Sequence, residues 1–443
     1  MRTTQIFFAG SLYGATTLAA AIDSGCFTPA DRRLLLVSNN ATTPETTPAL
    51  DEMAGFERLR GRFDGVLSWN EAISPFHPGG WAPRGDDAPM WERYLRLLWD
   101  LGDDRIELAV ESIQVNPALA IAQLFPDATL DVYADGLMSY GPTRNKIDPL
   151  VGERVRRLFH LDLVPGLKPL LLEEFGAEPR IVPTEAFVKV VDELSDAVAD
   201  AVADAVPSVK EGPALLLGQY LAALGILTPE EEEALHLRML RGAVALGHRR
   251  IVFKPHPTAP ASWSRALQRE AESLDAELTV LDMPLLAEVL YRQLRPALVA
   301  GCFSTALFTA STFYGIPVAR IGTEPLLDRL TPYQNSNRVP LTIVDALLPD
   351  LAEGGAGTPK EADETVTGLL SAVGFAMQPQ IRPDLRPAAE SYLSRSLHSA
   401  TLRYFKRRRL TVLGLPGGVP VPRGAAVRRV VRRARRLKRV ALG

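Results

Sequence analysis

The chain has 443 residues, 47% of them hydrophobic and 23% charged, which excludes a fully disordered or fibrous protein. The net charge of −3 hides an asymmetry, because residues 401–443 hold 14 Lys or Arg and no Asp or Glu. The first 400 residues therefore carry 35 basic against 52 acidic residues, a balance of −17. Two cysteines, Cys26 and Cys302, predict neither a disulfide framework nor a zinc cluster and favour a reducing cytoplasm. No apolar run is long enough to span a membrane.

Strand-like and helical runs alternate in the first half of the chain. Short apolar runs predict buried strands at residues 5–9, 33–38, 65–68, 107–111 and 129–133. Helical patterns lie at residues 15–24, 90–99 and 117–124, and an Ala/Val/Asp helix spans residues 193–206. This alternation predicts a parallel sheet with helices on both faces. The segment PSVKEGP at 207–213 then interrupts the pattern and predicts a linker.

The alternation starts again after the linker. Strands are predicted at residues 214–217, 250–254, 277–281, 297–300 and 317–321, and helices at 229–246, 261–274, 285–291 and 305–314. We therefore predict an α/β protein with two Rossmann-like domains facing each other across a cleft. The predicted domains are 1–206 and 214–400, joined by the linker 207–213 and followed by a basic tail, 401–443. Ligands of such sheets bind at the carboxyl ends of the strands, so functional residues are expected there.

The first candidate motif follows the strand at 129–133. Asp135 comes just after this strand, and Gly136 lets the chain turn sharply there. A carboxylate at this point can act as a general base toward a hydroxyl group. Asp-Gly is also a common turn dipeptide, so a capped turn stays open as the alternative.

The second candidate is a histidine after the strand at 250–254. His256 stands between Pro255 and Pro257, which restrict the backbone on both sides. A histidine at a strand's carboxyl end can protonate a leaving group or stabilise developing negative charge. The alternative is a loop histidine packed against Pro257.

The third candidate follows the strand at 297–300. The chain runs through Gly301 to Ser304 and Thr305, at the start of a predicted helix. Hydroxyls and free backbone N–H groups at a helix N-terminus form an anion site, and phosphate is its natural occupant. An ordinary helix N-cap explains the same residues.

Other classes of site lack their motifs. The sequence contains no GxxxxGK[ST], and no GxGxxG follows a predicted strand. A P-loop NTPase and a nicotinamide-dependent enzyme are therefore not expected. No His, Cys and Asp cluster has metal-ligand spacing, so no metal site is predicted.

Taken together, Ala134-Asp135-Gly136, His256-Pro257 and Ser304-Thr305 resemble the motifs of the bacterial α-2,8-polysialyltransferase family, among the GT-B bacterial sialyltransferases. The chain departs from the family in one respect, because Ala134 replaces one acid of an acidic pair. Three more stretches are similar to the family: Gly10-Ser11-Leu12-Tyr13-Gly14, Phe76-His77-Pro78 with Trp81, and Leu217-Gly218-Gln219.

The resemblance implies a GT-B fold and an inverting transfer of sialic acid, or a related nonulosonic acid, from CMP-sialic acid to a glycan hydroxyl. Asp135 would be the base and His256 the acid. No cofactor or metal is expected for this chemistry. The donor-binding residues would be Gly218, Gln219, Lys254, Pro257, Gly301, Ser304 and Thr305. The acceptor-side residues would be Gly10, Ser11, Tyr13, His77, Trp81, Gly136 and Ser139.

The tail at 401–443 has apolar residues at helical spacing between 427 and 441, with Arg and Lys filling the remaining positions. This pattern predicts a basic amphipathic helix, typical of binding to an anionic membrane. A polyanionic partner and a solvated, disordered tail are the alternatives, and no specific nucleic acid is expected. We therefore expect a cytoplasmic protein, peripheral at the inner face of the membrane.

Two other functions stay open. A CDP-glycerol-type polymer transferase would also expel CMP and use paired Rossmann-like domains. A non-catalytic polyanion- or membrane-binding protein would use the body only as a scaffold. For a transferase, the acidic body must still bind an anionic donor. We therefore expect a locally positive cleft, with Lys254, Arg144 and Lys146 as the candidate cations.

Overall fold

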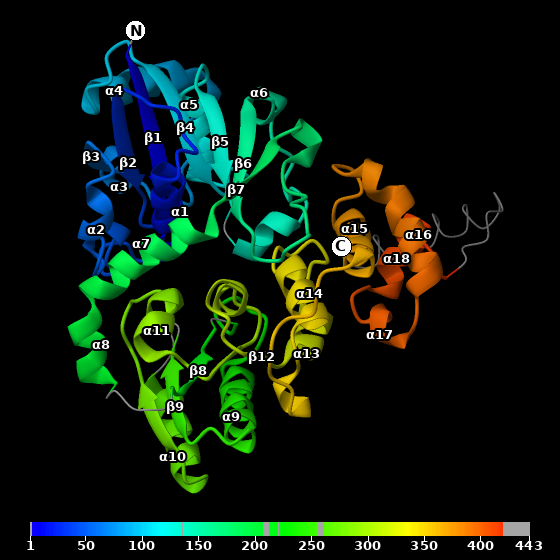
Figure 1. Ribbon diagram of the computed structural model, residues 1–443. Helices are drawn as coiled ribbons and strands as arrows, with labels where there is room; N and C mark the ends of the chain where they lie inside the picture. Colours follow the sequence, from blue (N-terminus) through cyan, green and yellow to red (C-terminus); the bar gives the residue numbers. More distant parts are fainter. Residues whose placement is uncertain (1, 135, 207–211, 220, 256–260, 420–443) are drawn as a thin grey trace, which may run out of the picture.

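A computed structural model of the chain describes residues 2–134, 136–206, 212–219, 221–255 and 261–419 (Figure 1). It contains two parallel sheets, one on each side of the predicted linker, with helices packed around them. This confirms the predicted α/β class with two Rossmann-like units. In the part of the chain that is described, no helix is long and apolar enough to cross a membrane.

The first sheet has seven strands in the order β3-β2-β1-β4-β5-β6-β7. They are β1 (Thr3–Ala9), β2 (Arg32–Val37), β3 (Gly65–Ser68), β4 (Arg105–Glu111), β5 (Thr129–Tyr133), β6 (Val155–Leu161) and β7 (Glu178–Val182). The first five confirm the predicted strands. The prediction missed β6, which carries three polar side chains, and β7, an edge strand that is exposed along most of its length. The first six strands have the Rossmann order, with the topological switch point between β1 and β4.

The core of the first domain lies on both faces of this sheet. Successive residues of β1 point to opposite faces, so Phe7 packs in one apolar cluster and Phe8 in the other. Helices α1 (Leu12–Asp23), α4 (Ala88–Leu98) and α5 (Ala118–Leu124) confirm the three helices predicted here. The short helices α2 (Glu57–Arg60), α3 (Trp69–Ala72) and α6 (Pro149–Gly152) complete the domain.

The second sheet has five strands in the order β10-β9-β8-β11-β12. They are β8 (Ala214–Leu217), β9 (Arg250–Lys254), β10 (Glu277–Val280), β11 (Leu298–Gly301) and β12 (Val318–Arg320), and all five were predicted. Helices α9 (Pro229–Ala245), α10 (Ala261–Ser273) and α11 (Ala287–Leu294) were predicted as well. The strand order repeats that of the first sheet, so a second switch point lies between β8 and β11.

The helix predicted at 193–206 is instead two helices, α7 (Thr184–Ala197) and α8 (Ala199–Ala205), separated at Val198. The Ala/Val/Asp repeat continues through Val198, so no residue type marks the break. Helix α7 packs against α1 on one side and α11 on the other, and it therefore lies between the two sheets (Figure 1).

The chain after β12 returns to the first domain. Helices α13 (Thr323–Arg329), α14 (Arg338–Leu347), α15 (Glu364–Met377) and α16 (Arg386–Ser396) follow the second sheet. Beyond α15, Arg382 forms an ion pair of 2.8 Å with Glu173 and donates to the Leu170 carbonyl, 3.1 Å away. The side-chain amide of Gln378 donates to the Arg144 carbonyl at 2.6 Å. These contacts join the C-terminal helices to the carboxyl-end side of the first sheet.

The predicted start of the tail at residue 401 is wrong. Helices α17 (Ser399–Leu402) and α18 (Arg407–Leu413) pack on the body, and Leu410 is fully buried. Arg403 pairs with buried Asp345 at 2.8 Å, and Lys406 pairs with Asp328 at 2.8 Å. Basic side chains of the predicted tail therefore hold this segment on α13 and α14. Residues 420–443 lie outside the described residues.

Candidate active site between the two sheets

The first switch point is formed by Gly10, just after β1, and Glu111, the last residue of β4. The Gly10 N–H donates to Glu111 Oε1 at 2.8 Å. A side chain at position 10 would meet that oxygen at 2.7 Å, so only glycine fits without a shift. Tyr133, the register partner of Glu111 on β5, donates its hydroxyl to the Phe8 carbonyl at 2.8 Å and to Glu111 Oε2 at 3.2 Å.

Sequence reasoning missed Glu111. A signal was present, because an acid ends a predicted strand, but no glycine follows it to mark a turn as Gly136 does after Asp135. Glu111 places a carboxylate at the end of the strand next to β5, in register with Tyr133.

Two predicted acceptor-side residues lie on the helix that follows β1. The Ser11 hydroxyl accepts from the Gly14 N–H at 3.1 Å and so caps α1. The Tyr13 ring packs edge-on against Phe187 of α7, with 5.6 Å between ring centroids.

The second switch point is held by hydrogen bonds between its loops. The side-chain carbonyl oxygen of Gln219 accepts from the Phe303 N–H at 2.9 Å and so connects the loop after β8 to the loop after β11. Gly218 donates its N–H to the Lys254 carbonyl at 2.9 Å, and a side chain there would meet that oxygen at 3.2 Å and the Phe253 ring at 3.0 Å. At Gly301 a side chain would make only ordinary contacts, the nearest at 3.5 Å. A side chain would therefore be tightly packed at position 218 and easily accommodated at position 301.

The two domains meet at Gly136 and Thr305. Gly136 has φ +58°, and a Cβ on it would lie 2.2 Å from Thr305 Oγ1. The Leu137 N–H donates to the same hydroxyl at 3.3 Å. Of the three motifs singled out in the sequence, two are thus brought into contact, one from the carboxyl end of β5 and one from the loop after β11. Asp135, His256 and Pro257 lie outside the described residues.

The segment after Thr305 is not the regular helix that the sequence predicted. Ser304 precedes α12 (Ala306–Phe308), and its hydroxyl accepts from the Ala306 N–H at 3.2 Å. A π-helical turn, η5 (Thr309–Phe313), follows the helix. The Thr309 hydroxyl donates to Glu288 at 2.8 Å, and burial raises the pKa of the Glu288 carboxyl. The wider turn of a π-helix lets the Thr309 hydroxyl reach this buried acid, in the helical segment that follows the Ser304-Thr305 motif.

The predicted cations occupy three different surroundings. The Lys254 ammonium is mostly buried and donates to the Met283 carbonyl at 3.2 Å, and burial lowers its pKa although nearby Glu288 and Asp282 oppose the shift. Arg144 is half-buried, and burial lowers its pKa. Lys146 is exposed.

Arg144 lines a small cavity of about 30 Å³ between the domains. Ser139 lines it from the first domain, and Ser336 and Val339 from the segment before α14 and its first turn. The Ser139 hydroxyl is buried and donates to the Gly136 carbonyl at 3.0 Å, so it supports the turn that carries the contact with Thr305.

His77 and Trp81 lie along the edge of the first sheet that carries the first switch point, beside β2 and β3. His77 lines a groove of about 840 Å³ at the carboxyl ends of these strands, and its Nε2 is 2.9 Å from the Ala41 carbonyl. The Trp81 ring packs against Trp69 and Trp91, with centroids 5.7 and 4.9 Å away. Neither residue belongs to the contact between Gly136 and Thr305.

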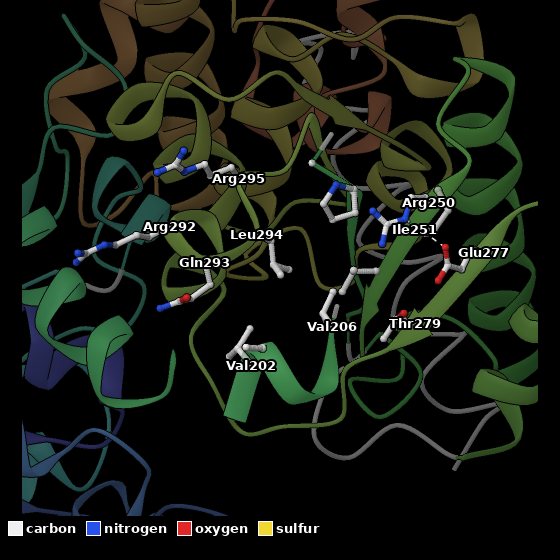
Figure 2. Close-up of a pocket in the computed structure, with 14 residues that line it drawn as sticks. Val202, Val206, Arg250, Ile251, Glu277, Thr279, Arg292, Gln293, Leu294 and Arg295 are labelled. Carbon is white, nitrogen blue, oxygen red and sulfur yellow. Dashed lines mark hydrogen bonds and ion pairs between the residues drawn. The ribbon is translucent and has the colours of Figure 1, made fainter. Parts of the chain in front are cut away.

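Another cavity, of about 510 Å³, lies at the opposite edge of the second sheet (Figure 2). Arg250 and Glu277, the first residues of β9 and β10, line it and pair with each other at 3.2 Å. Arg292 also lines it and pairs with Asp192 and Asp196 of α7, at 3.2 Å in each case. Because this cavity is at the amino ends of the strands, it is separate from the switch-point site.

Two Rossmann-ordered domains in series, whose switch-point edges meet at Gly136 and Thr305, define the GT-B class of glycosyltransferases. Within that class the chain belongs to the alpha-2,8-polysialyltransferase (POLYST) family, whose model matches residues 5–323. No curated protein matches the chain.

Solved structures with a similar fold include the GT-B domain of a Photobacterium damselae sialyltransferase, which is 12% identical with a TM-score of 0.41 and covers 76% of this chain and 95% of that one. A putative UDP-N-acetylglucosamine 2-epimerase from Listeria monocytogenes is 10% identical with a TM-score of 0.41 and covers 85% and 96%.

Proposed function

We propose that the protein transfers sialic acid, or a related nonulosonic acid, from CMP-sialic acid to a hydroxyl group of a glycan, with inversion at the anomeric carbon. The observation that carries the proposal is the contact between Gly136 and Thr305 in a member of the polysialyltransferase family. It joins the acid–glycine turn of one domain to the Ser/Thr motif of the other. A base and a donor-phosphate site would then share one cleft.

In this mechanism Asp135 removes the proton of the acceptor hydroxyl as its oxygen forms a bond to the anomeric carbon. The bond from that carbon to the phosphate oxygen breaks in an oxocarbenium-like transition state. His256 protonates the departing CMP phosphate or stabilises its charge. Ser304 and Thr305 hold the phosphate, and the loops of Gly218, Gln219 and Gly301, with the Lys254 ammonium behind them, form the rest of the donor side.

The test is CMP release by the purified full chain, with CMP-sialic acid, CDP-glycerol and UDP-N-acetylglucosamine offered in turn with a panel of glycan acceptors. We expect release from CMP-sialic acid alone. Asp135→Asn and His256→Ala should each lower turnover about 100-fold or more, the usual effect of losing a general base or acid. Asp103→Asn and His398→Ala change exposed residues of the same types and should leave turnover unchanged. Undiminished release by both site variants, or turnover of CDP-glycerol instead, would overturn the proposal.

A further inference from the structure

The small cavity between the domains is lined by side chains that can donate hydrogen bonds. Four of them are Ser112, Gln114, Arg144 and Ser336. The first three belong to the first domain, and the fourth precedes α14, beyond the second sheet. Ala134 lines the same cavity; it follows β5 and precedes the proposed base, Asp135, in the chain. The cavity therefore lies at the strand end from which the proposed base follows.

These four donors have no acceptor in the part of the chain that is described. The Arg144 guanidinium forms no ion pair or hydrogen bond there, and the Ser112 and Ser336 hydroxyls donate to no described group. The side-chain oxygen of Gln114 accepts from the Arg144 N–H, which fixes the orientation of the amide and leaves its nitrogen as the free donor. Donors that lie together without an acceptor suit a ligand with acceptor oxygens.

Arg144 is held in place by its backbone and not by its side chain. Its N–H donates to Gln114 Oε1, and its carbonyl accepts from the side-chain amide of Gln378, just after α15, at 2.6 Å. The side-chain amide of Asn145 donates to the Gln114 carbonyl at 3.2 Å. The half-buried guanidinium is thus positioned from both domains while no described acid neutralises it. This is the arrangement of a preorganised anion site.

The size and the charge of the cavity together favour a carboxylate. Its volume of about 30 Å³ holds about two oxygen-sized groups, because one water needs about 10–15 Å³ of such space. A sugar ring does not fit, whereas the two oxygens of a carboxylate do. Among the described residues no Asp or Glu lines the cavity, and a guanidinium binds a carboxylate through two parallel hydrogen bonds.

We infer that Arg144 and Gln114 bind the carboxylate of a nonulosonic acid residue at the end of the acceptor, and so select acceptors that already carry one. The inference rests on the proposed function for the identity of the sugar, and on the cavity for the group that is recognised. The acceptor is expected here because the proposed donor loops, at 218–219 and 301–305, belong to the second domain. Arg144 and Gln114 are specificity determinants and take no part in the chemical step.

The experiment compares sialyllactose with its carboxamide, in which the acid is neutral and the sugar is otherwise the same. Binding to the full chain is measured by calorimetry with no donor present, and the KM of each is measured by CMP release. We expect the unmodified protein to favour the acid about tenfold or more in both, the usual contribution of hydrogen bonds to a charged group. In Arg144→Gln the ratio should fall to within about twofold. Arg144→Lys should give an intermediate ratio, because it keeps the charge without the planar fork.

Gln114→Glu tests the second donor. It keeps the oxygen that accepts from the Arg144 N–H and replaces the free amide nitrogen with a carboxylate oxygen. Sialyllactose should bind about tenfold more weakly, and the carboxamide should change much less. Arg93→Gln is the matched control, because Arg93 is exposed on α4 and pairs with no described residue. It should leave the ratio of acid to carboxamide unchanged.

Equal binding of the acid and the carboxamide by the unmodified protein, or an equal loss of preference in Arg93→Gln and Arg144→Gln, would overturn the inference. A higher KM for CMP-sialic acid in Arg144→Gln, with the acceptor ratio unchanged, would also overturn it, because the carboxylate recognised would then be the donor's. If no acceptor yields CMP, but the acid still binds more tightly and Arg144→Gln removes the difference, the proposed function fails and the carboxylate site stands.

Discussion

The two switch points have the same strand order but opposite chemistry. In the first, the Glu111 carboxylate is held by the Gly10 N–H and the Tyr133 hydroxyl, and the surface beyond it is acidic. In the second, Gln219 and the Phe303 backbone form an uncharged junction, and the half-buried Lys254 lies at the end of the adjacent strand β9. The fold supplies two equivalent edges, and the side chains on each edge give it a different charge.

This comparison bears on the expectation of a locally positive cleft. The cations expected from the sequence are present, but Lys254 lies in the second domain and Arg144 lies between the domains. The groove beside β2 and β3 has no Lys or Arg among its described lining residues.

The largest effect is expected where the two edges meet. In Gly136→Ala, the new methyl group would collide with Thr305 Oγ1, and the left-handed backbone would also be strained. We expect turnover to fall about 100-fold, because a displacement of about 1 Å at the reacting groups has that effect. Unfolding free energy should fall by about 2–3 kcal/mol, measured by urea denaturation.

Gly176→Ala is the matched control for that substitution. Gly176 has φ +72° and no atom within 4 Å of the place where the new methyl group would lie, so only the backbone strain is shared. It should lower the unfolding free energy by about 1 kcal/mol and leave turnover intact. Equal loss of turnover in both variants would show that the contact with Thr305 is not what matters.

The next effect concerns the first switch point. Glu111→Gln removes the charge that accepts from Gly10 and Tyr133, and we expect kcat/KM to fall about tenfold, the usual value of a charge-assisted hydrogen bond. Glu107→Gln changes the same residue type near the other end of β4, where Glu107 accepts from Gln5 at 3.0 Å. It should lower the melting temperature without lowering kcat/KM. Loss of activity in Glu107→Gln but not in Glu111→Gln would contradict the assignment.

A smaller effect is expected at the second switch point. Gln219→Leu removes the acceptor for the Phe303 N–H, and the KM for CMP-sialic acid should rise about fivefold with kcat nearly unchanged, since a neutral hydrogen bond contributes about 1 kcal/mol. Gln293→Leu is the control, because Gln293 bonds Ser195 near the opposite edge of the same sheet. An unchanged KM in Gln219→Leu would show that this junction does not contribute to donor binding.

The sequence predicted the strands that build both switch points, because their residues are buried on both faces and form continuous apolar runs. It missed β7, whose exposed edge position leaves no apolar pattern, and β6, whose run is interrupted by Arg156 and Arg157. It also identified Gly136 and Thr305 separately but could not show their contact. Two residues so far apart in the chain touch only because the domains pack against each other, and no local pattern records that packing.

The acidic groove was hidden for a similar reason. Glu45, Asp51 and Glu52 come from the segment that ends with the 3-10 turn Leu50–Glu52, and Glu71 comes from α3, so the four acids form no single cluster in the sequence. Only the aromatic and histidine positions beside them stand out. The sequence also led to a wrong expectation for the basic segment at 403–409. It reads as part of a free tail, but its partners, Asp328 and Asp345, lie far back in the chain, on and near α13 and α14.

The smallest effect on catalysis is expected from removing residues 420–443, which follow the residues of both switch points in the sequence. We propose that their basic amphipathic pattern binds anionic membrane, so the truncated chain should lose about tenfold or more of its binding to phosphatidylserine vesicles in flotation. Turnover of a soluble acceptor and the melting temperature should both stay within error, because the motifs that form both switch points lie within residues 10–305.

The variant Arg403→Gln/Lys406→Gln tests the role of the basic residues at 403–406 separately from that of residues 420–443. These side chains pair with Asp345 and Asp328, and the Asp345 carboxylate is fully buried, so breaking the pairs should lower the melting temperature by several degrees. Vesicle binding should be unchanged, because both cations already have partners in the body. If this variant lost vesicle binding as strongly as the truncation, the membrane contact would include the folded segment 399–413. The assignment of Arg403 and Lys406 to packing, and of residues 420–443 to membrane binding, would then be wrong.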